Sequence, residues 1–318
     1  MALLLGMAAV AMPAMAQPDL SRHTGRTVAD ASVPGWHWHR LHAASADGQQ
    51  QYRIQVAVPQ RPAPAAGFPV AYLLDGNAAL METDAALLQR LAASAHPPVI
   101  AYIAHDNDLR IDSDARALDY TPRRPGGGQA QRDVLGERRT GGADAFLELI
   151  QGEIRAQVEA LAPVDPGRRA LWGHSYGGVF VLHALFTRPA AFTVYAAADP
   201  SLWWGEGHML REERDALHVT APAPALYLWT GDGSAAAAAP RTPPPGRSPE
   251  AVAAMQRARG SVPADATQHM AERQRARGLR VYWTPLPGLS HGQTLGASLP
   301  LLLQALAGDA PASDGAQR

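Results

Sequence analysis

The sequence predicts a doubly wound α/β fold, in which a mostly parallel sheet opens with an antiparallel hairpin. Two observations support this prediction. Short apolar runs alternate with longer segments of helical character along most of the chain, and a turn signal joins two alternating segments near its start. The 318 residues, 47% of them hydrophobic, are enough for one large domain, which we expect to span residues 17–308.

The predicted strands are of two kinds. Residues Trp36 to Ala43 and Gln51 to Val58 read as the antiparallel pair, which the Asp47-Gly48 turn connects. The remaining strands are short apolar runs that suit a sheet covered on both faces. They are Val70 to Leu74, Val99 to Ala104, Ala170 to Trp172, Val194 to Ala198, Ala225 to Thr230 and Arg280 to Thr284.

Five helical candidates lie between or after these runs, at residues 78–93, 143–161, 179–187, 264–277 and 293–307. Two stretches interrupt the alternation. Residues 106–142 are polar and glycine-rich, and we expect a long functional loop over the sheet. Residues 234–263 are rich in alanine and proline, and we expect a mobile surface insertion.

The apolar segment from Met1 to Ala16 ends in Ala14-Met15-Ala16 and looks like a secretory signal peptide. It lacks the usual positively charged start, so an apolar N-terminal helix is the alternative. The segment is too short to span a bilayer. We expect a periplasmic or secreted protein without stable membrane insertion, ending in a disordered tail at residues 309–318.

Composition disfavours several classes of function. The 28 basic and 29 acidic residues give a net charge of −1, so the chain lacks the basic surface that a nucleic acid requires. Because there are no cysteines, disulfides, thiolate metal sites and a cysteine nucleophile are excluded. The chain has no H-E-x-x-H spacing, and His37 and His39 read as a stacked pair on a strand. We expect neither a metal nor a cofactor.

The strongest chemical signal is Gly173-His174-Ser175-Tyr176-Gly177, which fits the G-x-S-x-G pattern of a nucleophile elbow. An apolar run precedes it and a helical segment follows it, which is the context that the motif requires. Such a turn strains the serine backbone and presents the hydroxyl at the carboxyl end of the sheet. The motif predicts Ser175 as a nucleophile, and a chance pentapeptide in a glycine-rich chain is the alternative.

A serine nucleophile needs a base, and the order along the chain in this fold is serine, acid, histidine. His291 lies in a loop after the last predicted strand and before the closing helix, which makes it the predicted base. Asp232 follows the run that ends at Thr230, where an orienting carboxylate would leave the sheet. Since Asp232-Gly233 is equally a turn dipeptide, a Ser–His dyad is the alternative.

An oxyanion hole requires one backbone N–H after the nucleophile and one from the loop that follows the strand ending near residue 74. Tyr176 supplies the first donor. For the second, Asn77 is the preferred candidate and Gly76 is the alternative.

Several segments resemble the Putative esterase family of α/β-hydrolases, and the nearest likeness is to periplasmic siderophore esterases that act on enterobactin and salmochelin. The matching segments, besides the elbow, are Tyr72-Leu73-Leu74-Asp75-Gly76-Asn77, Arg116 with Asp119-Tyr120-Thr121-Pro122, Gly142 to Ile150, Pro200-Ser201-Leu202-Trp203-Trp204 and Leu289-Ser290-His291-Gly292. The resemblance implies an α/β-hydrolase fold and hydrolysis of an ester in a catecholate macrolactone or its linear fragments, through an acyl-enzyme on Ser175. The small-molecule partner would be a ferric or an apo siderophore.

The resemblance leaves three alternatives open: a general carboxylesterase, an acyltransferase of the same family, and a catalytically inactive ligand-binding protein on this fold. Arg116 and Tyr120, on the long loop, are candidates for a cation and an aromatic face that contact a catecholate. Trp203 and Trp204 could form an aromatic wall or could equally pack in the core. The chain departs from the family at Asp199, where a serine is commoner, and an unpaired carboxylate there would disfavour an anionic substrate.

Overall fold

The computed structural model describes residues 22–126, 131–133, 138–216, 222–233 and 249–308. Its centre is an eight-stranded sheet with the strand order β1-β2-β4-β3-β7-β8-β9-β10. These strands are β1 (Trp36–Ala44), β2 (Gln51–Pro59), β3 (Phe68–Leu73), β4 (Val99–His105), β7 (Val164–His174), β8 (Val194–Ala198), β9 (Ala225–Gly231) and β10 (Arg280–Leu286). β2 pairs antiparallel with β1 and β4, and the other neighbouring pairs are parallel. The predicted fold, a parallel sheet that opens with an antiparallel hairpin, is confirmed.

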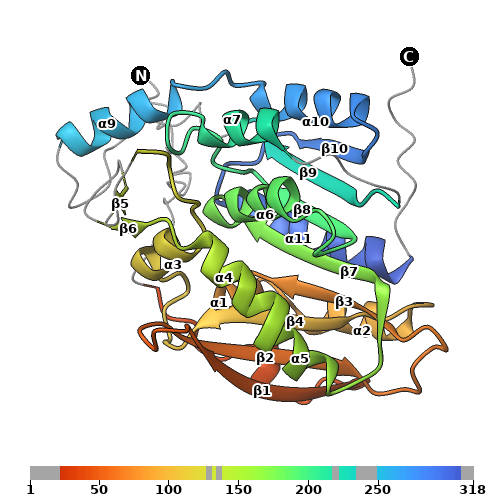
Figure 1. Ribbon diagram of the computed structural model, residues 1–318. Coiled ribbons are helices and arrows are strands. Elements are labelled where there is room, and N and C mark those ends of the chain that lie inside the picture. Colours follow the sequence, from red (N-terminus) through yellow and green to blue (C-terminus); the bar gives the residue numbers. More distant parts are fainter. Residues whose placement is uncertain (1–21, 127–130, 134–137, 217–221, 234–248, 309–318) are drawn as a thin grey trace, which may run out of the picture.

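Helices cover both faces of the sheet (Figure 1). One face packs against α4 (Ala143–Leu149), α6 (Tyr176–Thr187), α7 (His208–Asp215) and α10 (Ala266–Ala276). The other face packs against α1 (Gly76–Met81), α2 (Ala85–Ala93) and α11 (Gln293–Ala307). The remaining elements are the short helix η1 (Val28–Asp30), α3 (Ser113–Asp119), the π-helical segment η2 (Ile150–Ile154), α5 (Arg155–Glu159), α9 (Pro249–Arg259) and a small hairpin of β5 (Gln131–Arg132) and β6 (Arg139–Thr140).

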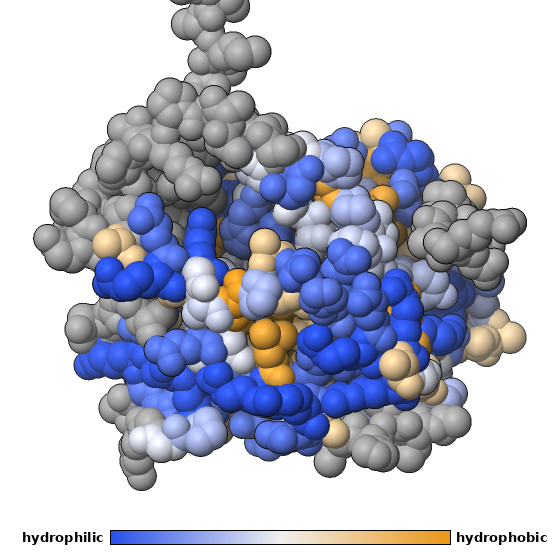
Figure 2. All heavy atoms as spheres, turned by 90° about the horizontal axis from the view of Figure 1, so that it is seen from above, coloured by the Kyte–Doolittle hydropathy of each residue, from blue (hydrophilic) through white to orange (hydrophobic). Residues whose placement is uncertain are grey.

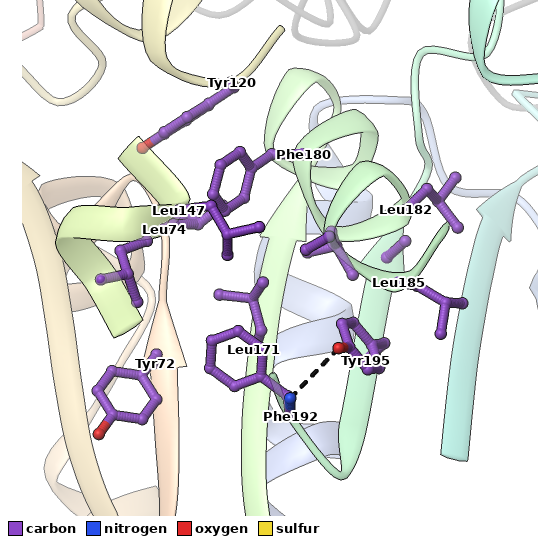
Figure 3. Close-up of a cluster of buried hydrophobic side chains, with 14 of the residues drawn as sticks. Tyr72, Leu74, Tyr120, Leu147, Leu171, Phe180, Leu182, Leu185, Phe192 and Tyr195 are labelled. Carbon is purple, nitrogen blue, oxygen red and sulfur yellow. Dashed lines mark hydrogen bonds between the residues drawn. The ribbon is translucent and has the colours of Figure 1, made fainter. Parts of the chain in front are cut away.

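The central strands send alternate side chains into two hydrophobic layers, as the two-residue period of a strand requires. In β7, Leu171 belongs to the layer beneath α6, whereas Ala170 and Trp172 belong to the layer beneath α11. Figure 3 shows Phe180 and other side chains of α6 over the strands that carry Leu171 and Tyr195. Every residue of α6 from Tyr176 to Phe186 is buried, so the helix that follows the elbow is held on all sides.

Four stretches differ from the sequence-based expectation. The segment 78–93 forms two helices instead of one, because Asp84 caps a new helix by accepting the Leu87 N–H at 2.6 Å. The expected loop at 106–142 contains α3 and the β5–β6 hairpin, and α7 was not expected at all. Within the expected insertion at 234–263, residues 249–259 form a helix.

The predictions of a signal peptide at 1–16 and of a tail at 309–318 lie outside the described residues, as does the segment 234–248 of the insertion. Within the part of the chain that the structure describes, none of the helices has the length and apolar character needed to cross a membrane. The face that carries α10 and β10 is mainly hydrophilic, with small apolar patches (Figure 2).

A buried histidine joins three helices on the α6 face. His183 of α6 lies with Nδ1 2.7 Å from Glu212 Oε1 of α7 and Nε2 3.2 Å from Asp144 Oδ1 of α4. Burial alone would lower the pKa of His183, but hydrogen bonds to Asp144 and Glu212 outweigh burial and raise the pKa to about 9. The imidazolium therefore stays charged in the folded protein at neutral pH.

The raised pKa of His183 predicts a loss of stability on the alkaline side. Because the folded state holds the proton more tightly than the unfolded state, the stabilisation is complete below pH ~6.5 and disappears as the pH rises through about 9. We expect the free energy of unfolding to fall by about 2 kcal/mol over this interval. Urea denaturation at several pH values measures it, and the same slope in His183→Gln would contradict the assignment.

Candidate active site

The nucleophile elbow lies between β7 and α6. Ser175 has φ 62° and ψ −114°, a conformation that side chains rarely adopt outside such turns. The turn needs small neighbours: a Cβ on Gly173 would lie 2.4 Å from the Gly177 carbonyl oxygen, and one on Gly178 would lie 2.9 Å from Pro200 Cα. The strand–turn–helix context predicted for the motif is present, and it presents Ser175 at the carboxyl end of the sheet.

The loop between β10 and α11 brings a histidine to this serine. His291 Nε2 lies 3.0 Å from Ser175 Oγ. His174, the residue before the serine, donates from Nε2 to the His291 carbonyl oxygen at 2.7 Å. Thr294 Oγ1 donates to the same carbonyl oxygen, also at 2.7 Å. The elbow and the first turn of α11 thus hold the backbone of the loop in place.

His174 is neutral in this position. Burial is the main cause that lowers its pKa well below the ordinary value, and repulsion from His291 when that ring is protonated, and from the Arg116 guanidinium, lowers it further. A neutral imidazole carries one N–H, and the contact with the His291 carbonyl assigns it to Nε2. Since the His174 and His291 rings lie 4.7 Å apart, a neutral His174 does not oppose protonation of His291.

The carboxylate next to His291 comes from Asp199, directly after β8. Asp199 Oδ2 lies 3.1 Å from His291 Nδ1, and both side chains are partly exposed. Asp199 has φ 42°, and its N–H donates to the Trp229 carbonyl oxygen at 2.7 Å. Ser175, His291 and Asp199 therefore form one hydrogen-bonded chain, in which both ring nitrogens of the histidine are engaged.

The structure places Asp199 at His291 Nδ1, the position for which the sequence predicted Asp232. Asp232 accepts the Gly288 N–H at 2.9 Å, so it belongs to the turn that supports the β10–α11 loop. The acid lies one strand nearer to the nucleophile than expected, because β8 and not β9 is the neighbour of β7 in the sheet. This also explains the departure at Asp199, whose carboxylate is paired with an imidazole instead of facing a substrate alone.

The proposed oxyanion donors lie in the first turns of two helices. Tyr176 is the first residue of α6, and Gly76 and Asn77 are the first two residues of α1. Backbone N–H groups in a first turn have no acceptor within their own helix. Gly76 packs so closely that a Cβ would lie 2.6 Å from the Tyr102 carbonyl carbon, and the Asn77 side chain donates to the Asn107 carbonyl oxygen at 2.9 Å.

Arg116 is a buried residue of α3 and does not lie on an exposed loop. Its Nε and Nη2 donate to the two carboxylate oxygens of Asp75 at 2.9 and 2.8 Å. Nη2 also donates to the His174 carbonyl oxygen at 3.1 Å. Burial lowers the pKa of Arg116, but the Asp75 carboxylate outweighs burial and raises the pKa, so the guanidinium stays charged. Arg116 joins the turn after β3 to the elbow, and it is buried instead of lying on an exposed loop as expected.

The aromatic candidates separate into buried and accessible residues. Tyr120 is 1% exposed and its hydroxyl accepts the Asp75 N–H at 2.9 Å, so it supports the same turn from within the core and not from an exposed loop. Trp204 is also 1% exposed and packs in the core. Trp203 is partly exposed, with its ring centroid 6.1 Å from that of Tyr176, and it remains a candidate wall of the site.

Sequence reasoning missed two functional candidates. Asp199 was noted only as a departure from a family pattern, although a carboxylate after a buried strand next to the elbow strand is a usable signal. Ser201 lies with Oγ 3.1 Å from Ser175 Oγ and was quoted only as part of a matching segment. No local pattern marks either residue, because both depend on which strands are neighbours.

The profile of the Putative esterase family matches residues 45–285. The apo-salmochelin esterase of Escherichia coli O6:H1 is 37% identical over 214 residues, which are 67% of this chain and 64% of that protein. The ferri-bacillibactin esterase BesA of Bacillus subtilis is 30% identical over 218 residues, 65% of this chain and 72% of that protein. The chain thus aligns with less than two thirds of the first relative.

Solved structures of similar proteins cover more of the chain. The enterobactin and salmochelin hydrolase IroE superposes with a TM-score of 0.67 at 29% identity, over 88% of this chain and 99% of that one. The siderophore hydrolase EstA from Aspergillus nidulans superposes with a TM-score of 0.67 at 30% identity, over 86% of this chain and 94% of that one. These likenesses extend over nearly all of the described residues.

Replacing each of the two aspartates should affect the rate to a very different extent. Asp199→Asn should lower kcat for p-nitrophenyl acetate by roughly 10²- to 10⁴-fold, because the amide no longer holds the imidazole in the tautomer that accepts the serine proton. Asp232→Asn should change kcat by much less, since its carboxylate accepts the Gly288 N–H in the turn that supports the β10–α11 loop. Steady-state kinetics of both variants measure this, and a larger loss in Asp232→Asn would contradict the assignment.

Proposed function

Because the chain belongs to the Putative esterase family, we propose that it is a serine esterase that hydrolyses ester bonds of a catecholate siderophore macrolactone or its linear fragments. The observation that carries the proposal is the chain of hydrogen bonds from Ser175 through His291 to Asp199. The substrate class is supported by relatives whose names state siderophore esterase activity.

Acylation follows from the geometry of these residues. His291 Nε2 accepts the Ser175 proton while Oγ attacks the ester carbonyl carbon, and the carbonyl electron pair moves to its oxygen. The N–H groups of Tyr176 and Asn77 donate to that oxyanion. When the intermediate collapses, the bond to the alcohol oxygen breaks, and the imidazolium gives its proton to the leaving alcohol. The product remaining on the enzyme is an ester of Ser175.

Deacylation repeats the sequence with water. His291 accepts a proton from water as the oxygen attacks the acyl carbon, and collapse returns the electron pair and the proton to Ser175 Oγ. Asp199 accepts the Nδ1–H throughout and stabilises the imidazolium that forms in each half-reaction.

Two features at the site suit a substrate that carries catechol rings and negative charge. Trp203 presents a partly exposed indole next to Tyr176, whose backbone is a proposed oxyanion donor. A catechol ring can stack on such a surface. Asp199 is paired with His291, so it does not present a free carboxylate to an anionic substrate.

The substrate assignment is tested by comparing an enterobactin-type trilactone with p-nitrophenyl acetate. We expect kcat/KM to be higher for the trilactone than for p-nitrophenyl acetate. Ser175→Ala should lower kcat/KM for each of the two substrates by at least ~10³-fold. A fluorophosphonate probe should label the wild type and not Ser175→Ala. Turnover of the short ester alone would contradict the siderophore substrate and keep the esterase. If the wild type were neither labelled by the probe nor able to turn over either substrate, it would be an inactive binding protein.

We also propose that residues 1–16 are removed during export and that the protein acts in the periplasm or outside the cell. The support is the small-residue pattern Ala14-Met15-Ala16 after an apolar segment. N-terminal sequencing of protein recovered from a periplasmic extract should begin at Gln17, whereas a start at Met1 would contradict cleavage.

A further inference from the structure

The nucleophile has a second hydroxyl partner. Ser175 Oγ lies 3.0 Å from His291 Nε2 and 3.1 Å from Ser201 Oγ. Ser201 is 1% exposed, and its backbone N–H donates to the Ser175 carbonyl oxygen at 3.2 Å. Both the backbone and the side chain of Ser201 therefore bind the residue that carries the nucleophile.

The turn after β8 sets the position of this hydroxyl. The chain leaves β8 through Asp199 at φ 42°, and Pro200 packs on Gly178 in the first turn of α6. Leu202 N–H donates to the Pro200 carbonyl oxygen at 2.8 Å, and Trp204 N–H donates to the Ser201 carbonyl oxygen at 2.9 Å. The same turn thus delivers the carboxylate to His291 and a hydroxyl to Ser175.

The neighbouring contacts decide the direction of the hydrogen bond. Asp199 is acceptor-only when ionised, so His291 donates from Nδ1 and its Nε2 must accept. Ser175 then uses its only proton toward Nε2. In its contact with Ser201, Ser175 Oγ can only accept, and Ser201 is the donor.

We infer that Ser201 is a further catalytic residue, whose hydroxyl stabilises negative charge on Ser175 Oγ when the acyl-enzyme breaks down. The inference rests on the proposed serine-esterase function. In deacylation, the bond between the acyl carbon and Oγ breaks, the electron pair moves to Oγ, and His291 returns the proton. A hydrogen bond from Ser201 to Oγ strengthens as that charge develops.

The effect is larger in deacylation than in acylation, because the two ground states differ. In the free enzyme, Oγ is a hydroxyl oxygen that already accepts a good hydrogen bond from Ser201. In the acyl-enzyme, Oγ is an alkyl ester oxygen, which is a weak acceptor, so the bond gains more on reaching the transition state. Only the part of an interaction that strengthens in the transition state accelerates a step.

Ser201→Ala tests this role with p-nitrophenyl acetate. Stopped-flow release of p-nitrophenolate with enzyme in excess measures acylation, and loss of the acetyl group, followed by the mass of the intact protein, measures deacylation. We expect the deacylation constant to fall about 10- to 100-fold, the range of a hydrogen bond to a charged oxygen, and the acylation constant to fall by a smaller factor. Ser201→Thr, which keeps a hydroxyl, should restore the ratio of the two constants.

The matched control is Ser298→Ala in α11, which removes a buried hydroxyl that bonds Trp172 and the Leu295 carbonyl, away from the nucleophile. It should leave the ratio unchanged, and melting temperatures show whether each variant folds. If Ser201→Ala does not fold, Ser201→Gly is the second variant without the hydroxyl. An unchanged ratio of the two constants, whether both fall by the same factor or neither falls, would overturn the role of Ser201. Absence of any adduct on wild-type Ser175 would instead contradict the proposed function itself.

Discussion

In three neighbouring strands, β3, β7 and β8, the chain leaves the sheet through a non-glycine residue with positive φ. These residues are Asp75 at 48°, Ser175 at 62° and Asp199 at 42°. Such conformations cost about 1–3 kcal/mol each and persist only where the surroundings impose them. The parallel register brings the three turns together, because the carboxyl ends of β3, β7 and β8 lie at one edge of the sheet. The candidate donors, nucleophile and acid all lie at or next to these turns.

Buried polar contacts connect the turns to one another. Arg116 bonds the Asp75 carboxylate and the His174 carbonyl oxygen, so it connects the turn after β3 to the elbow. His174, kept neutral by burial, bonds the loop that carries His291. A buried ion pair contributes little net stability compared with apolar packing, and its value here lies in fixing the geometry. The positions of the reacting groups thus depend on residues that do not themselves react.

The sequence predicts the fold and two members of the candidate triad, because these depend on local patterns. Ser175 has its elbow motif, and His291 has its place between the last strand and the closing helix. The choice between Asp199 and Asp232 could not be made in the same way, since it depends on the order of strands in space. The burial of Arg116 was missed for a related reason: α3 turns what reads as a polar loop into a packed element, and Asp75, 41 positions earlier, provides the partner charge.

The central claim is that Ser175 carries the acyl group during turnover. Rapid acid quenching of the enzyme during trilactone hydrolysis, followed by digestion and peptide mass measurement, tests it most directly. The account predicts a peptide containing Ser175 that is heavier by one acyl fragment of the substrate, and that this adduct is missing when His291 is replaced. Continued hydrolysis with Ser175 unmodified at every quench time, or an acyl group found on another residue, would contradict it.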